Sequence, residues 1–137
     1  MGYSGSSYMD VPMNQKIFMA QYECIKKLAE QESCIIVGRC ADYALKDMPG
    51  LVSVFISADM DFKIKRVIEM YGCDEVKAKD IINKTNKKRA SYYNFYSNKK
   101  WADSRSYNLC INSSVVGIEN AADLIIQFMN LKLNKKD

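Results

Sequence analysis

Gly38 and Arg39 are the residues of this chain best suited to chemistry, and they follow an apolar run at positions 34–37. A guanidinium is permanently charged and can grip a phosphate through two parallel hydrogen bonds. In α/β proteins, ligands bind beyond the carboxyl ends of the strands, which is where Gly38 and Arg39 would stand. The pair therefore predicts an anion site, with a structural ion pair between Arg39 and Asp42 as the alternative.

Two further groups of polar residues have helical spacing. The first is a basic cluster formed by Lys63, Lys65 and Arg66, which either approaches a phosphate or is a solvated surface. In the second group, Asn86 and Arg89 are three positions apart and share one face of a predicted helix. An amide and a guanidinium on one face can address neighbouring groups of a single ligand.

The positive charge of the chain is concentrated in residues 84–105. This window holds seven basic residues and one acid, so it carries +6, and the rest of the chain sums to −2 for a net charge of +4. Such a block indicates an anionic partner, either the phosphates of a small molecule or a nucleic-acid backbone. The alternative is a solvated helix face.

Aromatic residues interleave with this basic block and have two interpretations. They are Tyr92, Tyr93, Phe95, Tyr96 and Trp101, and they lie near Lys99 and Lys100. Such a set can stack on the bases of a single-stranded nucleic acid. The three-residue and four-residue spacing of Tyr92, Phe95 and Tyr96 is instead typical of a helix that packs on its own domain.

The chain has five cysteines and no histidine. The cysteines are scattered without a CxxC pair, which argues against a zinc site and favours reduced thiols. Cys34 and Cys110 lie within apolar runs, so we expect both to be small buried side chains. Cys40 is adjacent to Arg39, and a neighbouring cation can lower the pKa of a thiol. A nucleophilic role for Cys40 would lack a histidine base.

Size and composition predict one globular domain, residues 1–137. No apolar run approaches the roughly 20 residues that a membrane span needs. Residues 1–11 lack the basic start and apolar core of a secretory signal. We therefore expect a cytoplasmic protein with no membrane association.

The apolar pattern predicts strands that alternate with helices, and hence an α/β fold. We expect strands at 34–38, 51–56 and 107–112, the first buried on both faces. Two helices are expected at 14–31 and 41–46. A third should begin at a cap formed by Ser57 or Asp59 and end at Gly72, and a fourth should begin after a cap at Asp74. A last helix is expected from Ile118 to Met129, followed by a frayed tail from Lys132.

Three elements of the sequence, taken in order, resemble the cytidylate-kinase-like proteins of the P-loop nucleoside monophosphate kinase group. They are the Gly-Arg-Cys-Ala-Asp segment at 38–42, the Arg-x-x-Tyr-Tyr run at 89–93, and the Trp-x-Asp-x-x-x-Tyr element at 101–107. The resemblance covers about residues 14–130. It implies a three-layer parallel sheet with helices on both faces, a P-loop NTPase fold, and a lid and helical region at about 59–106.

The resemblance also implies an activity, a transferase that moves the γ-phosphoryl group of ATP to a nucleoside monophosphate with Mg²⁺. It assigns Gly38, Arg39, Asp42 and Asn86 to acceptor binding. It assigns Lys63, Lys65 and Lys88 to the lid. Arg66 and Arg89 would be the catalytic arginines, because they neutralise phosphate charge in that scheme.

The sequence departs from the family pattern at three places. Cytidylate kinases have an acid at the position of Cys40 and an Asp at that of Asn86, so the acceptor specificity is open. The first strand and the phosphate-cradling GxxxxGK[ST] loop are missing from the printed residues. In this family that strand lies between those at 34–38 and 52–56. Three arrangements are open: the printed residues are part of a longer chain, the sheet rearranges so that the two strands become neighbours, or a homodimer or another partner completes the sheet.

Three functions follow, in order of preference. The first is a nucleotide kinase-like protein whose activity depends on ATP and Mg²⁺. The second is a non-catalytic nucleotide-binding or protein-interaction module. The third is a nucleic-acid binder that uses the basic block at 84–105. Of the two kinds of ligand, a nucleotide is favoured over a nucleic acid.

Overall fold

The structure is a computed structural model that describes residues 12–135. The chain divides into two compact units, with the boundary between Leu51 and Val52. Unit 1 contains two helices. Unit 2 contains both strands and the remaining helices. Each unit has its own buried cluster, so each is described separately.

Unit 1 is built from α1 (Met13–Gln31) and α2 (Ala41–Ala44). The buried residue of α1 is Ile25, which packs against Ala41, Ala44 and Leu45. Tyr22 and Ala29 lie three and four positions from Ile25, so they reach the same cluster from the same helix face. The predicted helices at 14–31 and 41–46 are therefore confirmed, the second in a shorter form.

The predicted strand at 34–38 is wrong. No residue of this segment is in a strand, and the side chains of Ile35 and Val37 are 95% and 88% exposed. Only Ile36 packs against the buried cluster of unit 1. A strand forms when a neighbour takes up its N–H and C=O groups, and no strand among residues 12–135 pairs with this segment. The expectation of burial on both faces is also wrong.

Unit 2 is organised around two parallel strands, β1 (Val54–Ser57) and β2 (Leu109–Asn112). Their register pairs Val54 with Leu109 and Ser57 with Asn112. The pairing is extended at its start, because the backbone N–H of Ser53 donates to Asn108 Oδ1 at 3.0 Å. The strands predicted at 51–56 and 107–112 are confirmed with shifted starts. The expected three-layer sheet is present only as this pair within the described residues.

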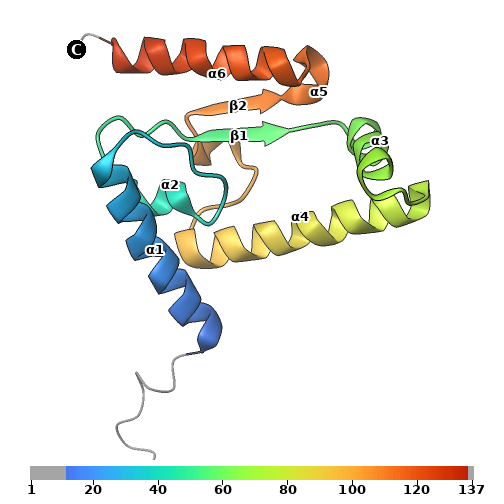
Figure 1. The fold of residues 1–137 in the computed structure, drawn as a ribbon, viewed down its shortest axis with the longest axis horizontal. Helices are drawn as coiled ribbons and strands as arrows, with labels where there is room; N and C mark the ends of the chain where they lie inside the picture. Colours follow the sequence, from blue (N-terminus) through green and yellow to red (C-terminus); the bar gives the residue numbers. More distant parts are fainter. Residues whose placement is uncertain (1–11, 136–137) are drawn as a thin grey trace, which may run out of the picture. The chain divides into compact units, whose positions relative to one another are not determined.

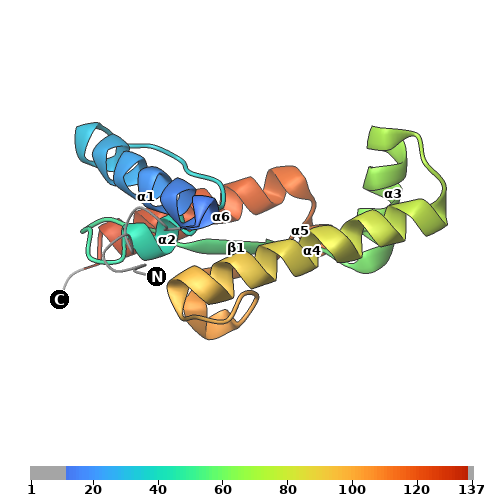
Figure 2. The ribbon, with the colours of Figure 1, turned by 90° about the horizontal axis from the view of Figure 1, so that it is seen from below.

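The helices of unit 2 are α3 (Met60–Tyr71), α4 (Glu75–Ser97), α5 (Ser113–Val116) and α6 (Ile118–Leu133), with a 3₁₀ turn, η1 (Ser104–Ser106). Figure 1 shows α6 on one side of the two strands and α4 on the other. The two strands run in the same direction (Figure 1), and the long helix α4, seen along its length in Figure 2, precedes β2 in the crossover between them. A helical crossover is what parallel strands require.

The helix ends follow the sequence signals closely. Asp74 caps α4, because its Oδ1 accepts from the backbone N–H of Lys77 at 2.7 Å. Gly72 ends α3 with a φ of 65°, the left-handed conformation that glycine adopts without a steric cost. Asp59 precedes α3 without a side-chain cap hydrogen bond. The tail expected from Lys132 starts later than predicted, because α6 continues to Leu133, and residues 136–137 lie outside the described part of the chain.

A cluster that we call the aromatic corner, formed by Phe55, Tyr93, Trp101 and Tyr107, joins β1, α4 and the segment before β2. The ring of Phe55 meets Trp101 edge-on at 5.2 Å and Tyr107 at 5.0 Å, measured between centroids. Tyr93 stacks on Tyr107 at 5.8 Å and is buried. Packing on the domain was also predicted for Tyr92, Phe95 and Tyr96. Tyr92 and Tyr96 are half-buried with ring centroids 4.8 Å apart, whereas the prediction is wrong for Phe95, which is 75% exposed.

Candidate functional site

The turn at residues 38–41, which we call the Arg39 turn, places the first candidate residues. The backbone φ is +73° at Gly38, +57° at Arg39 and +54° at Cys40. The backbone N–H of Ala41 donates to the carbonyl oxygen of Gly38 at 3.1 Å, which closes the turn. Positive φ at both central residues is the pattern of a type I′ turn, which usually contains Asn and Gly.

The Arg39 turn is strained, because only glycine adopts left-handed φ freely. The conformation costs about 1–2 kcal/mol for each ordinary L-residue. Arg39 and Cys40 both bear this cost, which the packing of Ala41 and Leu45 in unit 1 offsets. Strain of this kind is concentrated at functional sites.

The Arg39 side chain is exposed, and among residues 12–135 no hydrogen bond or ion pair is recorded for its guanidinium. The ion pair with Asp42 that the sequence offered as an alternative is therefore not formed. Asp42 instead accepts a hydrogen bond from the backbone N–H of Tyr43 at 2.9 Å. The five donors of the Arg39 guanidinium are left for solvent or a ligand.

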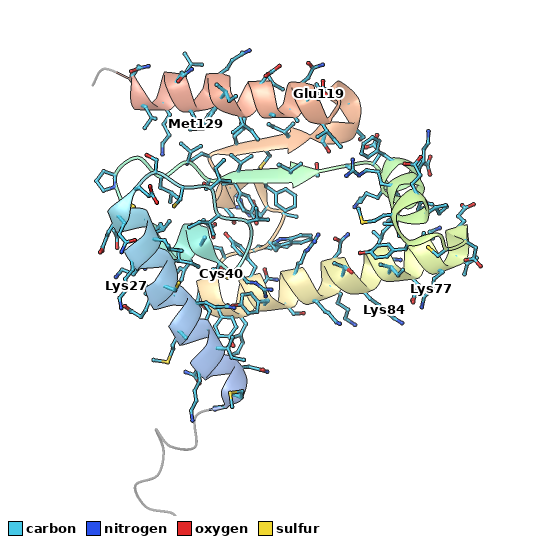
Figure 3. All side chains as sticks on the ribbon, viewed as in Figure 1. Lys27, Cys40, Lys77, Lys84, Glu119 and Met129 are labelled. Carbon is cyan, nitrogen blue, oxygen red and sulfur yellow. The ribbon has the colours of Figure 1, made fainter. Side chains whose placement is uncertain are left out.

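The pKa of the Cys40 thiol is raised, whereas a neighbouring Arg39 could have lowered it. Its side chain is 3% exposed and lies beside α2 (Figure 3). Burial, followed by the negative charge of Asp42, raises the pKa of the Cys40 thiol to about 11. Cys34 and Cys110, which were expected to be buried, are exposed. All five cysteines are free, and Cys40 is protonated at neutral pH.

The basic cluster of α3 lies on the solvent side of that helix. Ile64 faces α4 and packs against Ala78 and Ile82, so its neighbours on the other side of α3 point outward. Lys65 and Arg66 are exposed and Lys63 is half-buried. The guanidinium of Arg66 lies 5.9 Å from the centroid of the Phe62 ring, one turn earlier on α3.

The second predicted pair, Asn86 and Arg89, lies in the middle of α4. Asn86 is half-buried, whereas Arg89 and Lys88 are exposed. No hydrogen bond or ion pair among the described residues joins these side chains to the basic cluster of α3. Lys84, labelled in Figure 3, is paired with Asp80 at 3.0 Å, as on an ordinary solvated helix.

A polar network at the carboxyl ends of β1 and β2 was not anticipated from the sequence. Asn112 Nδ2 donates to Asp59 Oδ1 at 2.9 Å, and the backbone N–H of Asp59 donates to Ser114 Oγ at 2.9 Å. Ser113 Oγ donates to the carbonyl oxygen of Ser57 at 3.0 Å. The carboxyl edge of a parallel sheet is a common ligand site. The signal available in the sequence was a polar Ser, Asp or Asn immediately after each apolar run.

The Trp-x-Asp-x-x-x-Tyr element is structural in this molecule. Arg105 donates to Asp103 through Nε at 3.0 Å and Nη2 at 2.7 Å, a bidentate ion pair. These side-chain hydrogen bonds, together with one from the Arg105 backbone N–H, hold the pKa of Asp103 well below its usual range. The Trp101 backbone N–H donates to Asn94 Oδ1 at 2.7 Å. The element therefore shapes the aromatic corner.

The described residues do not offer a metal-binding group. Within residues 12–135, no three side chains of the His, Cys, Asp and Glu types are arranged to hold a metal ion. No helix in the described part of the chain is long and apolar enough to cross a membrane.

These elements define a mixed α/β protein with parallel strand pairing and a strained, arginine-bearing turn. The sequence profile of the cytidylate kinase-like family matches residues 1–115. The chain belongs to this family, and it is a nucleotide kinase-like protein.

A solved structure is similar to this chain over most of its length. It is the crystal structure of an uncharacterized protein from Eubacterium ventriosum ATCC 27560, which is 43% identical. The TM-score is 0.83, and the alignment covers 88% of this chain and 68% of that one. No curated protein matches the sequence. The fold is therefore shared with a homologue that is itself described as uncharacterized.

Proposed function

We propose that this chain binds the phosphate of a nucleoside monophosphate through Arg39 and takes part in phosphoryl transfer to that acceptor. The observation that carries the proposal is the exposed guanidinium of Arg39 in a strained turn. A structural arginine in this protein is paired as Arg105 is, whereas no partner is recorded for Arg39 among residues 12–135. In a member of the cytidylate kinase-like family, the ligand that suits such a group is a nucleotide phosphate.

The remaining candidate residues have supporting roles in this proposal. Gly38 and Asp42 flank Arg39 in the acceptor site, and Asn86 contributes a hydrogen-bonding amide. Arg66 and Arg89 bring positive charge to the transferring phosphoryl group, while Lys63, Lys65 and Lys88 act as the lid. Phosphoryl transfer needs little more than positioning and charge neutralisation, so exposed cations suit it.

The test of acceptor binding is calorimetric titration of the whole chain with cytidine and uridine monophosphates. Replacing Arg39 by Ala is expected to weaken binding about 10–100-fold, because a charge-assisted hydrogen bond contributes about 1.5–3 kcal/mol. Lys27→Ala is the matched control, since Lys27 is an exposed cation of α1 in the same unit (Figure 3). Equal affinity of wild type and Arg39→Ala would contradict the proposal.

A second function, nucleotide binding without catalysis, has one specific observation in its favour. The 137 printed residues contain no GxxxxGK[ST] loop, which in P-loop kinases supplies the backbone donors and the lysine for the donor phosphates. Incubation with MgATP and a pyrimidine monophosphate separates the two functions. Formation of a diphosphate supports the kinase, and monophosphate binding without turnover supports the non-catalytic protein.

The nucleic-acid alternative has less support. Trp101 and Tyr93 are engaged by Phe55 and Tyr107, so these rings are not free to stack on bases. Affinity for an oligonucleotide that falls steeply with salt would revive this alternative.

A further inference from the structure

An apolar groove in unit 2 runs along the strand β2. Its volume is about 460 Å³, and it is lined by β2, by residues of α5, and by one side of α6 that includes Leu124, Phe128 and Leu131. None of the ten lining residues is charged, although the chain carries a net charge of +4. An uncharged, concave apolar surface is typical of an interaction site.

Several apolar side chains around the groove are exposed to solvent, which is unfavourable for apolar groups. Val115 is 73% exposed, Leu131 is 74% exposed and Leu124 is 40% exposed. By contrast Ala121, three residues before Leu124 on the same face of α6, is 4% exposed. Figure 1 shows α6 lying along β2, and the face of α6 that carries these residues is buried at Ala121 and exposed at Leu131.

The groove is bordered by an open strand edge. The backbone N–H of Leu109 donates to the carbonyl oxygen of Ser53 at 3.2 Å, and the carbonyl oxygen of Ile111 accepts from Ser57 Oγ. Leu109 and Ile111 therefore face β1. Because alternate residues of a strand point to opposite edges, the N–H and C=O of Cys110 face away from β1. No strand among the described residues pairs with that edge.

We propose that this surface binds a second copy of the chain, with the two β2 strands antiparallel about a twofold axis at Cys110. An antiparallel hydrogen-bonded pair is reciprocal, so the N–H and C=O of one Cys110 match those of the other. The two sheets become one, and the α6 helices lie side by side on the same face with Leu124 and Leu131 between them. A partner of opposite charge is disfavoured because the groove is uncharged.

Two substitutions on α6 test which side of the helix pairs. Leu131 and Ile126 are both exposed and lie five residues apart, or about 140° around the helix. Leu131→Glu lies in the proposed interface, and Ile126→Glu is the matched control. Light scattering of wild type is expected to give twice the chain mass of 15.7 kDa. Leu131→Glu should be monomeric and Ile126→Glu dimeric.

Cys110 provides an independent readout of the register. The thiol is exposed, and residues opposite each other in an antiparallel pair have Cα atoms about 5.5 Å apart. A short bismaleimide should therefore link two copies in wild type but not in Cys110→Ser. A monomeric wild type at the highest soluble concentration would overturn the proposal. So would a dimer that is disrupted by Ile126→Glu, or one whose crosslinks join other cysteines.

Discussion

The Arg39 turn and the segment at 101–107, which carries Trp101 and Tyr107 of the aromatic corner, each have an arginine near an aspartate, yet the two arginines have different environments. Arg105 is bound to Asp103 by two side-chain hydrogen bonds, and the surrounding rings pack on one another. Arg39 is held in a left-handed turn with no ion pair to Asp42. The difference indicates that the aromatic corner is stabilised by its own contacts. The Arg39 turn is instead stabilised by the packing of Ala41 and Leu45, and its guanidinium forms no ion pair with Asp42.

The largest effect is expected in the reactivity of the thiols. Because burial raises the pKa of Cys40 to about 11, its thiolate fraction near pH 8 is about 100-fold below that of an ordinary cysteine. Iodoacetamide labelling followed by mass spectrometry should modify Cys24 and Cys34 long before Cys40. Rapid labelling of Cys40 in the folded protein would show that the Arg39 turn opens, and would remove the contrast with the aromatic corner.

The second effect concerns the aromatic corner. Trp101→Ala should lower the free energy of unfolding by about 2 kcal/mol, because the half-buried ring loses its packing against Phe55. Urea denaturation measures this loss. Phe95→Ala is the control, since Phe95 is 75% exposed and its replacement should change the stability by less than about 0.5 kcal/mol. An equal loss in both variants would mean that the corner is not a special source of stability.

A third experiment separates strain from function at the Arg39 turn. Gly38 and Gly72 have φ values of +73° and +65°, and open space surrounds both positions. Replacing either by Ala should cost about 1 kcal/mol of stability through backbone strain. Only Gly38→Ala should also weaken monophosphate binding, since Gly72 ends α3. If the two variants bind nucleotide equally well, the geometry of the Arg39 turn is not required for binding.

The smallest effect concerns pH. The pKa of Asp103 is lower in the folded protein than in the unfolded chain, where it is about 3.9. The ion pair therefore contributes stability above that pH, and the contribution is lost as the pH falls toward the folded value. Asp103→Asn should melt slightly below wild type at pH 7, and the difference should shrink below about pH 4. A difference that is constant down to pH 2 would mean that the carboxylate charge is irrelevant.

Local signals in the sequence predicted the helices of this protein well. The spacing of Tyr22, Ile25 and Ala29 predicted α1, and Asp74 and Gly72 marked helix ends that the structure contains. These features depend on residues within a few positions of one another, so the sequence alone determines them. The family could also be predicted from the sequence, because each of its motifs is a short continuous segment of the chain.

Tertiary structure decided the features that depend on distant partners. The apolar run at 34–37 has the composition of a buried strand, but a strand requires a paired neighbour, and Ile35 and Val37 are exposed without one among the described residues. The sequence likewise did not distinguish the paired Arg105 from the unpaired Arg39, or the buried Cys40 from the exposed Cys34. Burial, pairing and pKa depend on which groups meet in space, and only the folded chain brings those groups together.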